Sequence, residues 1–204
     1  MFVELLDKLR CPNDHADAWL VATASRTEHR HLLDATLGCP ECDAEFALRD
    51  GEVWFGVEGS ALVTTMTVNA ESTMRVAALL NLRERGLFAL EGAWGSFAAG
   101  LRALLDVDLL LVDPPTSAPV NEAQGTLRGV GDRWPLAPSS LHGLVLDHAT
   151  PARLADAVRV LRSNGRLVAP ADAALPAGVR ELARDADAWV AEKVGDVIPL
   201  TRKR

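Results

Sequence analysis

Several features that define other protein classes are missing from this 204-residue chain. No apolar run approaches the roughly 18 residues that a membrane-spanning helix needs, so no membrane segment is expected. Cysteines number only three, an odd count, and no secretory signal is recognisable, which argues against a disulfide framework. The net charge of -7 argues against direct binding of nucleic acid. These absences predict reduced thiols, an acidic surface and a cytoplasmic protein.

The three cysteines all lie in the first quarter of the chain, as Cys11-Pro12 and Cys39-Pro40-Glu41-Cys42. Two Cys-Pro knuckles separated by a hairpin-length spacer bring their side chains to one tetrahedral ion, and thiolates favour Zn2+ in that geometry. The fourth ligand is either His15 or Asp14, and His15 is preferred because imidazole is the commoner partner in a three-cysteine site. The competing interpretation is that the metal has been lost and the thiols pack in a small core.

The residues around these cysteines predict a small domain over residues 1–58. Apolar residues at positions 5, 6 and 9 predict a short helical segment, and residues 44–55 predict two strands around Asp50-Gly51. With the cysteine knuckles, this pattern resembles, over residues 2–55, the small zinc-ribbon proteins related to the activator subunit of tRNA and protein methyltransferases. The resemblance implies a docking and stabilising module that contributes no chemistry of its own.

Residues 59–70 are interpreted as a linker or an extra strand, and a second domain is predicted over residues 71–204. In this second part, helix-like and strand-like segments alternate. A helix is expected over 71–85 with Gly86 as its C-cap, and another begins at Thr150-Pro151 and is closed by Asn164-Gly165. The expected strands are residues 87–90, 108–113, 141–147 and 166–169, with a closing hairpin of 188–194 and 197–201.

Alternation of this kind favours an open, mostly parallel sheet of the doubly wound type, with a ligand crevice at the carboxyl ends of the strands. The segments 131–136, 142–148 and 159–167 make the stretch resemble the class I S-adenosylmethionine-dependent methyltransferase fold. The predicted fold class is therefore α/β: a shortened, Rossmann-like methyltransferase fold with a small N-terminal zinc ribbon.

The resemblance implies roles for four residues. Glu91 would lie at the end of the first strand, Asp113 would meet the ribose hydroxyls of the cofactor, and Asp132 would meet the adenine amine. Gly95 would be the remaining glycine of the cofactor loop. A carboxylate suits a ribose because it accepts two hydroxyl hydrogen bonds in bidentate geometry. Acids also end strands for solubility alone, which is the competing interpretation.

The cofactor loop departs from the family's pattern. The family places about three alternating glycines there, so that the backbone can approach the methionine part of the cofactor. Here Ala93 and Phe97 replace glycines, and Trp94 adds bulk. The proline-rich segment 114–119 opposes a helix after the second strand. His148 could take a proton, but the family's Asn-Pro-Pro-Tyr element is absent, and the chain contains no tyrosine.

The favoured interpretation is a non-catalytic scaffold or partner-binding subunit that holds Zn2+. The alternative is an active methyltransferase that binds S-adenosylmethionine and acts on RNA, protein or a small molecule. The ribbon is expected to dock on its own C-terminal domain, on a second copy or on another protein, with Trp54-Phe55 forming the contact.

Overall fold

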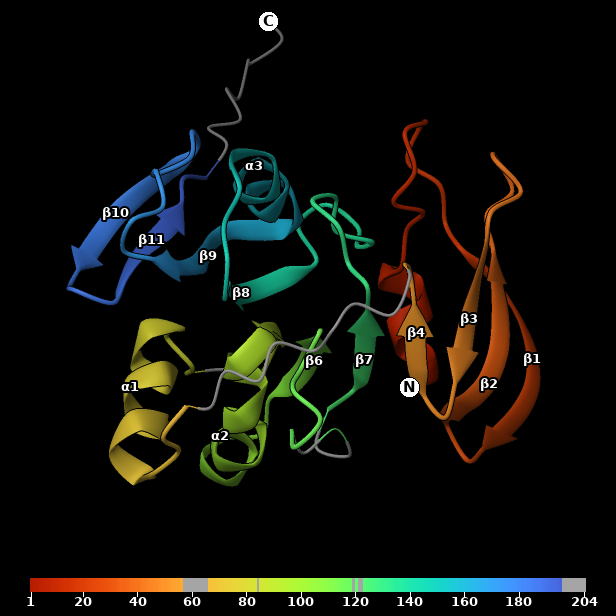
Figure 1. The fold of residues 1–204 in the computed structure, drawn as a ribbon, viewed down its shortest axis with the longest axis horizontal. Coiled ribbons are helices and arrows are strands. Elements are labelled where there is room, and N and C mark those ends of the chain that lie inside the picture. Colours follow the sequence, from red (N-terminus) through yellow and green to blue (C-terminus); the bar gives the residue numbers. More distant parts are fainter. Residues whose placement is uncertain (57–65, 84, 119, 121–122, 196–204) are drawn as a thin grey trace, which may run out of the picture.

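A computed structural model describes residues 1–56, 66–83, 85–118, 120 and 123–195. It contains one sheet of eleven strands, which runs through both predicted parts of the chain (Figure 1). The order of the strands is β1-β2-β3-β4-β7-β6-β5-β8-β9-β11-β10. Among the described residues, no helix is long and apolar enough to cross a membrane.

The first four strands form the ribbon, a run of antiparallel hairpins. They are β1 (Val21–Glu28), β2 (His31–Gly38), β3 (Glu45–Arg49) and β4 (Glu52–Trp54), and a 3-10 helix, η1 (Val3–Lys8), precedes them. The predicted turn at Asp50-Gly51 is confirmed. Asp50 has φ 48° and Gly51 has φ 83°, the left-handed pair that a tight hairpin turn requires.

The predicted α/β sheet is confirmed as the parallel part of a larger mixed sheet, which also includes a strand at residues 125–128 that was not predicted. The strands of this parallel part are β5 (Leu87–Glu91), β6 (Asp108–Val112), β7 (Gly125–Arg128), β8 (Leu141–Val145) and β9 (Leu161–Pro170). β5 lies in the middle and pairs with β6 on one side and with β8 on the other. The strand order therefore reverses beside β5, at the point where doubly wound sheets form their ligand crevice.

The predicted closing hairpin is partly correct. β11 (Ala188–Lys193) pairs antiparallel with β9, as expected for the segment 188–194. Its hairpin partner, however, is β10 (Val179–Arg184), which precedes it in the chain. Of the predicted second strand, 197–201, nothing is described, and most of the predicted linker 59–70 also lies outside the described residues.

The first long helix is shorter than predicted. α1 (Ala70–Leu79) begins with a capping box between Asn69 and Ser72, and it ends well before Gly86. Asn81 takes φ 54°, and the amides of Asn81 and Leu82 donate to the carbonyls of Ala78 and Ala77. This is the Schellman arrangement, so an asparagine provides the left-handed cap that the sequence pattern assigned to glycine.

The helix α3 (Pro151–Val160) starts as predicted, because Thr150 accepts a hydrogen bond from the amide of Arg153. The prediction that Asn164-Gly165 closes this helix is wrong. The chain passes directly into β9, and Asn164, with φ 63°, lies inside that strand. Asn-Gly favours a left-handed backbone, and here that conformation forms an irregularity within a strand instead of a helix cap.

The ribbon docks on its own C-terminal part through β4, one of the three possibilities left open by the sequence. β4 pairs in parallel with β7, and the amide of Phe55 extends the ladder to the carbonyl of Arg128 at 2.8 Å. The Arg128 guanidinium forms two hydrogen bonds of 3.0 and 3.2 Å to the Glu52 carboxylate across this seam. Gly56 and Gly129 meet where the two strands end, since a Cβ on Gly129 would lie 2.8 Å from the Gly56 nitrogen.

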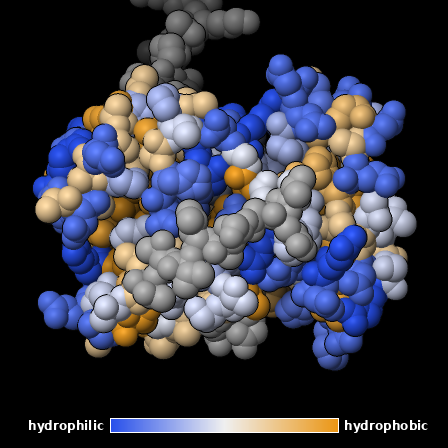
Figure 2. Space-filling view, viewed as in Figure 1, coloured by the Kyte–Doolittle hydropathy of each residue, from blue (hydrophilic) through white to orange (hydrophobic). Residues whose placement is uncertain are grey.

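Two apolar cores cover the two faces of the sheet. One face is covered by α1 and α2 (Ala98–Leu104), and the other is covered by α3 and η1, with apolar side chains of the ribbon strands in the same core. In the view of Figure 2, the face outside the grey residues is mostly hydrophilic, with smaller hydrophobic areas between the charged side chains.

Candidate functional site

The cluster of metal-type ligands lies at one end of the ribbon. The ligand atoms of Cys11, His15, Cys39 and Cys42 all lie within 4.8 Å of one another. The sulfurs of Cys11 and Cys42 are 3.8 Å apart, and the Cys39 sulfur lies 3.4 Å from Nε2 of His15. Three sulfurs and one imidazole nitrogen at such distances match the donor set of a tetrahedral site, so this cluster could bind a metal.

The surroundings of the cluster prepare it for a cation. His15 Nδ1 lies 2.6 Å from the carbonyl oxygen of Ala16, a contact that places the proton on Nδ1 and leaves Nε2 for a metal. Hydrogen bonds, first from the Asn13 side chain and then from the Ala44 backbone, lower the pKa of the Cys42 thiol to about 6. Burial raises the pKa of the Cys11 thiol to about 12 in the metal-free protein, and a bound cation would oppose that rise.

Asp14, the alternative fourth ligand, does not join this cluster. Its side chain is fully exposed, and one carboxylate oxygen lies 3.9 Å from the guanidinium of Arg133. Arg133 also donates to the carbonyls of Asn13 and His15, at 2.8 and 3.4 Å. The knuckle that carries His15 is thus fixed to the loop that follows β7.

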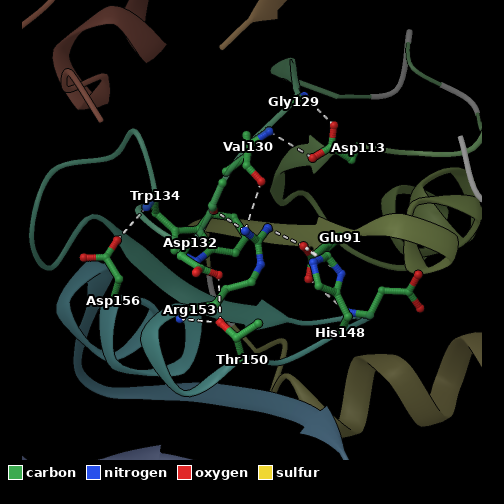
Figure 3. A network of polar contacts seen from close by, with 12 residues as sticks. Glu91, Asp113, Gly129, Val130, Asp132, Trp134, His148, Thr150, Arg153 and Asp156 are labelled. Atoms are coloured by element: carbon green, nitrogen blue, oxygen red, sulfur yellow. Dashed lines mark hydrogen bonds and ion pairs between the residues drawn. The ribbon is translucent and has the colours of Figure 1, made fainter. Parts of the chain in front are cut away.

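Glu91 lies at the carboxyl end of β5, at the reversal point of the sheet, and only 1% of its side chain is exposed. One oxygen is in contact with the guanidinium of Arg153, and the other accepts the amide of Asp147 at 3.0 Å. His148 lies 3.6 Å from the same carboxylate (Figure 3). Burial raises the pKa of the Glu91 carboxyl, and Arg153 opposes that rise.

Arg153 was not identified from the sequence, yet its side chain lies beside Glu91 at the carboxyl ends of the parallel strands. Its side chain is also 1% exposed, its guanidinium donates to the carbonyls of Val130 and Gly131, and it lies 4.6 Å from the ring of Trp134. The one available signal was physical: a carboxylate at the end of a buried strand needs a cation, and Arg153 lies in the first turn of a helix that begins near that edge.

The remaining predicted cofactor residues each have an internal partner. Asp113 accepts the amides of Gly129 and Val130 at 2.6 and 3.1 Å, one on each carboxylate oxygen (Figure 3). Asp132 accepts the Thr150 hydroxyl at 2.7 Å, beside the start of α3. A Cβ on Gly95 would lie 3.0 Å from Cβ of Pro114, so this glycine packs against the proline-rich segment.

Gly92 is the glycine that the sequence argument missed. It has φ 56°, and a Cβ there would lie 2.2 Å from Oδ2 of Asp147, so no other residue fits between β5 and β8. It opens η2 (Gly92–Phe97), whose Trp94 and Phe97 line a cavity of about 480 Å³ together with Leu146 and Asp147. The cavity lies between α1 and the carboxyl ends of β8 and β9.

No protein-family model matches this chain, and no curated protein matches it. Among solved structures, a candidate methyltransferase of an antibiotic biosynthesis pathway from Anabaena variabilis is 18% identical, with a TM-score of 0.37 over 48% of this chain and 44% of the other. A candidate S-adenosyl-L-methionine-dependent methyltransferase from Methanococcus maripaludis is 8% identical, with a TM-score of 0.44 over 64% and 87%. A complex containing the Haloferax volcanii Trm112 methyltransferase activator gives 20% identity and a TM-score of 0.37 over 48% and 50%.

The chain spans about half the length of the first of these structures. At such low identities and TM-scores, the likenesses give no information on function.

Proposed function

We propose that this protein is a non-catalytic scaffold with a methyltransferase-type sheet, in which a zinc ribbon extends the sheet and an internal ion pair fills the expected cofactor crevice. The observation that supports this proposal is the contact between Glu91 and Arg153, both 1% exposed, at the reversal point beside β5. A cofactor that needed this edge would have to displace a buried arginine from its carboxylate. Removing one partner of such a pair costs about 3 to 5 kcal/mol.

Asp113 supports the same proposal. Each oxygen of Asp113 accepts a backbone amide from the loop after β7, so this carboxylate has a structural role that needs no cofactor. Together with Arg128 and Gly129 at the seam, this loop joins the ribbon to the sheet. Asp113 therefore serves as an anchor for the ribbon seam.

The ribbon part of the proposal is a structural Zn2+ held by Cys11, His15, Cys39 and Cys42. Zinc would stabilise the two knuckles on which the first hairpin and the Arg133 contacts depend. A site of three thiolate ligands requires reduced cysteines, so we place the protein in the cytoplasm.

A scaffold requires a partner, and we expect that partner to be a protein bound through the ribbon. β4 is already paired with β7, whereas β1 is the terminal strand of the sheet and most of its side chains are exposed. Light scattering over a concentration series tests for a second copy of this chain: a dimer indicates self-association, and a constant monomer excludes a second copy as the partner.

The alternative, an active methyltransferase, is favoured by one observation. The cavity of about 480 Å³ beside Trp94 and Asp147 lies at the carboxyl ends of the strands, where a ligand of the doubly wound fold is expected.

Calorimetric titration of the zinc-loaded protein with S-adenosylmethionine and, separately, S-adenosylhomocysteine decides between the two. The scaffold proposal predicts no binding at millimolar ligand. Micromolar binding that Asp113→Ala abolishes would overturn it. Asp108→Ala is the matched control, because Asp108 lies at the opposite end of the same strand and pairs with Gln124.

A further inference from the structure

A second pocket lies at the amino ends of the parallel strands, on the edge of the sheet opposite to Glu91 and Asp113. Its volume is about 260 Å³. Its lining is dominated by side chains that donate hydrogen bonds. They are Asn81, Arg83, His142, Arg162, Asn164 and Arg166.

The irregular part of β9 brings three of these residues together. Leu141 pairs with Leu161, but the next pair is Gly143 with Arg166, so three extra residues of β9 bulge out between the two pairs. Asn164 takes φ 63° in this bulge, and a Cβ on Gly165 would lie 2.9 Å from the Arg162 carbonyl oxygen and 3.1 Å from that of His142. Bulges of this kind redirect side chains, and they are enriched next to functional sites.

The charge of the pocket is unusual for this protein. Three guanidinium groups, those of Arg83, Arg162 and Arg166, line one small space, although the whole chain carries a net charge of -7. Nε of Arg166 is buried without a hydrogen-bond partner in the described part of the chain. Its Nη2 lies 3.5 Å from Glu192, a carboxylate that also binds Arg180 at 3.1 Å. A buried donor without an acceptor is rare, and an anion in the pocket would supply one.

His142 lines the strand side of the pocket. Its Nδ1 accepts the amide of Leu87 at 3.2 Å, which places the ring proton of a neutral imidazole on Nε2. Gly86 allows this arrangement, since a Cβ there would lie 2.4 Å from the imidazole ring. The imidazole is therefore fixed in position by its backbone partner.

We propose that this pocket binds the phosphate group of a small phosphomonoester. Planar guanidinium groups pair with the oxygens of phosphate through parallel, charge-assisted hydrogen bonds, and the asparagine amides add neutral donors. The volume fits a phosphate with a short organic group, because pockets for larger ligands usually exceed about 300 Å³. The site is separate from the carboxyl edge, so it does not depend on whether that edge admits a cofactor.

The test is calorimetric titration of the full chain in chloride buffer, with glycerol 3-phosphate, inorganic phosphate and a short single-stranded oligonucleotide as probes. We expect saturable binding of glycerol 3-phosphate and weaker binding of inorganic phosphate. Arg83→Gln and Arg166→Gln should each weaken it by about tenfold, the usual effect of one charge-assisted hydrogen bond. Arg83 is exposed and has no ion pair within the described residues, so its variant keeps the fold.

Arg180→Gln is the matched control, because Arg180 contacts the same Glu192 but does not line the pocket. It should change the affinity by less than about twofold, as expected for a screened surface charge. No saturation at about 10 mM, which is about tenfold above a dissociation constant of 1 mM, would overturn the proposal. An equal loss of affinity in Arg83→Gln, Arg166→Gln and Arg180→Gln would also overturn it. The same holds if inorganic phosphate binds as tightly as glycerol 3-phosphate. Tighter binding of the oligonucleotide than of glycerol 3-phosphate would replace it with nucleic-acid binding.

Discussion

The ribbon end and the carboxyl edge of the parallel sheet each contain a set of residues that the sequence predicted as a site, and the structure treats the two sets differently. At the ribbon end, the ligand atoms of Cys11, His15, Cys39 and Cys42 turn toward one another. At the carboxyl edge, Glu91, Asp113 and Asp132 each turn toward a partner within the protein. Convergent donors leave a place for an ion, whereas acids with internal partners act as structural contacts.

Removal of the metal ligands should give the largest effect. We expect Cys39→Ser or exhaustive chelation to unfold the ribbon, because zinc-dependent folding in small finger peptides is worth about 10 to 16 kcal/mol. Zinc content per protein and circular dichroism measure the outcome. His15→Ala should lose metal, while Asp14→Ala is the matched control and should retain it. The reverse result for these two variants would assign the fourth ligand to Asp14.

Arg153→Met should break the carboxyl edge. Breaking a buried ion pair by removing one partner costs about 3 to 5 kcal/mol. The loss should grow between pH 5 and pH 8, since burial already raises the pKa of Glu91 and removing Arg153 raises it further. A raised carboxyl pKa means that the folded state binds more protons than the unfolded state. The free energy of unfolding is therefore highest in acid and falls as the pH rises and Glu91 loses its proton.

Denaturant unfolding at several pH values measures this loss. The double variant Glu91→Gln with Arg153→Met removes both charges and should recover much of the stability at pH 8. A loss for Arg153→Met that is the same at pH 5 and pH 8 would contradict the role given to Glu91.

Gly129→Ala should weaken the seam between the two regions. Gly129 has φ 67°, and its added Cβ would lie 2.8 Å from the Gly56 nitrogen, so we expect a loss of about 1 to 3 kcal/mol. Gly131→Ala is the matched control two residues away, because nothing lies within 4 Å of a Cβ there. Thermal unfolding of both variants is the measurement. An equal effect of the two would show that the seam is not tightly packed.

Asp113→Asn should have the smallest effect. It keeps the shape of the side chain but replaces one acceptor oxygen with an NH2 group, so one of the two amides loses its acceptor. We expect a loss of about 1 kcal/mol, with no change in cofactor titrations. Asp106→Asn, at an exposed ion pair with Arg85, should leave stability unchanged. Unaltered stability of Asp113→Asn, combined with a loss of measurable cofactor binding, would favour the catalytic alternative.

Local sequence patterns were sufficient where a few neighbouring residues decide the conformation. Asp50-Gly51 specified a hairpin turn, and Thr150-Pro151 specified a helix start, because the required backbone angles and cap are properties of those residues. The same reasoning failed at Asn164-Gly165. The left-handed conformation was correct, but the surrounding strand pairing made it a bulge.

Residue type, spacing and period were enough to predict the second hairpin of the ribbon, four of the five parallel strands from β5 to β9 and the set of metal-type ligands. Only the tertiary structure decided what the acids do. Arg153 reaches Glu91 from 62 positions away, and β4 joins β7 from a distant part of the chain. A carboxylate becomes a structural contact when the packing of the core places a cation or a backbone amide beside it. These partners come from distant parts of the chain, so local sequence patterns do not reveal them.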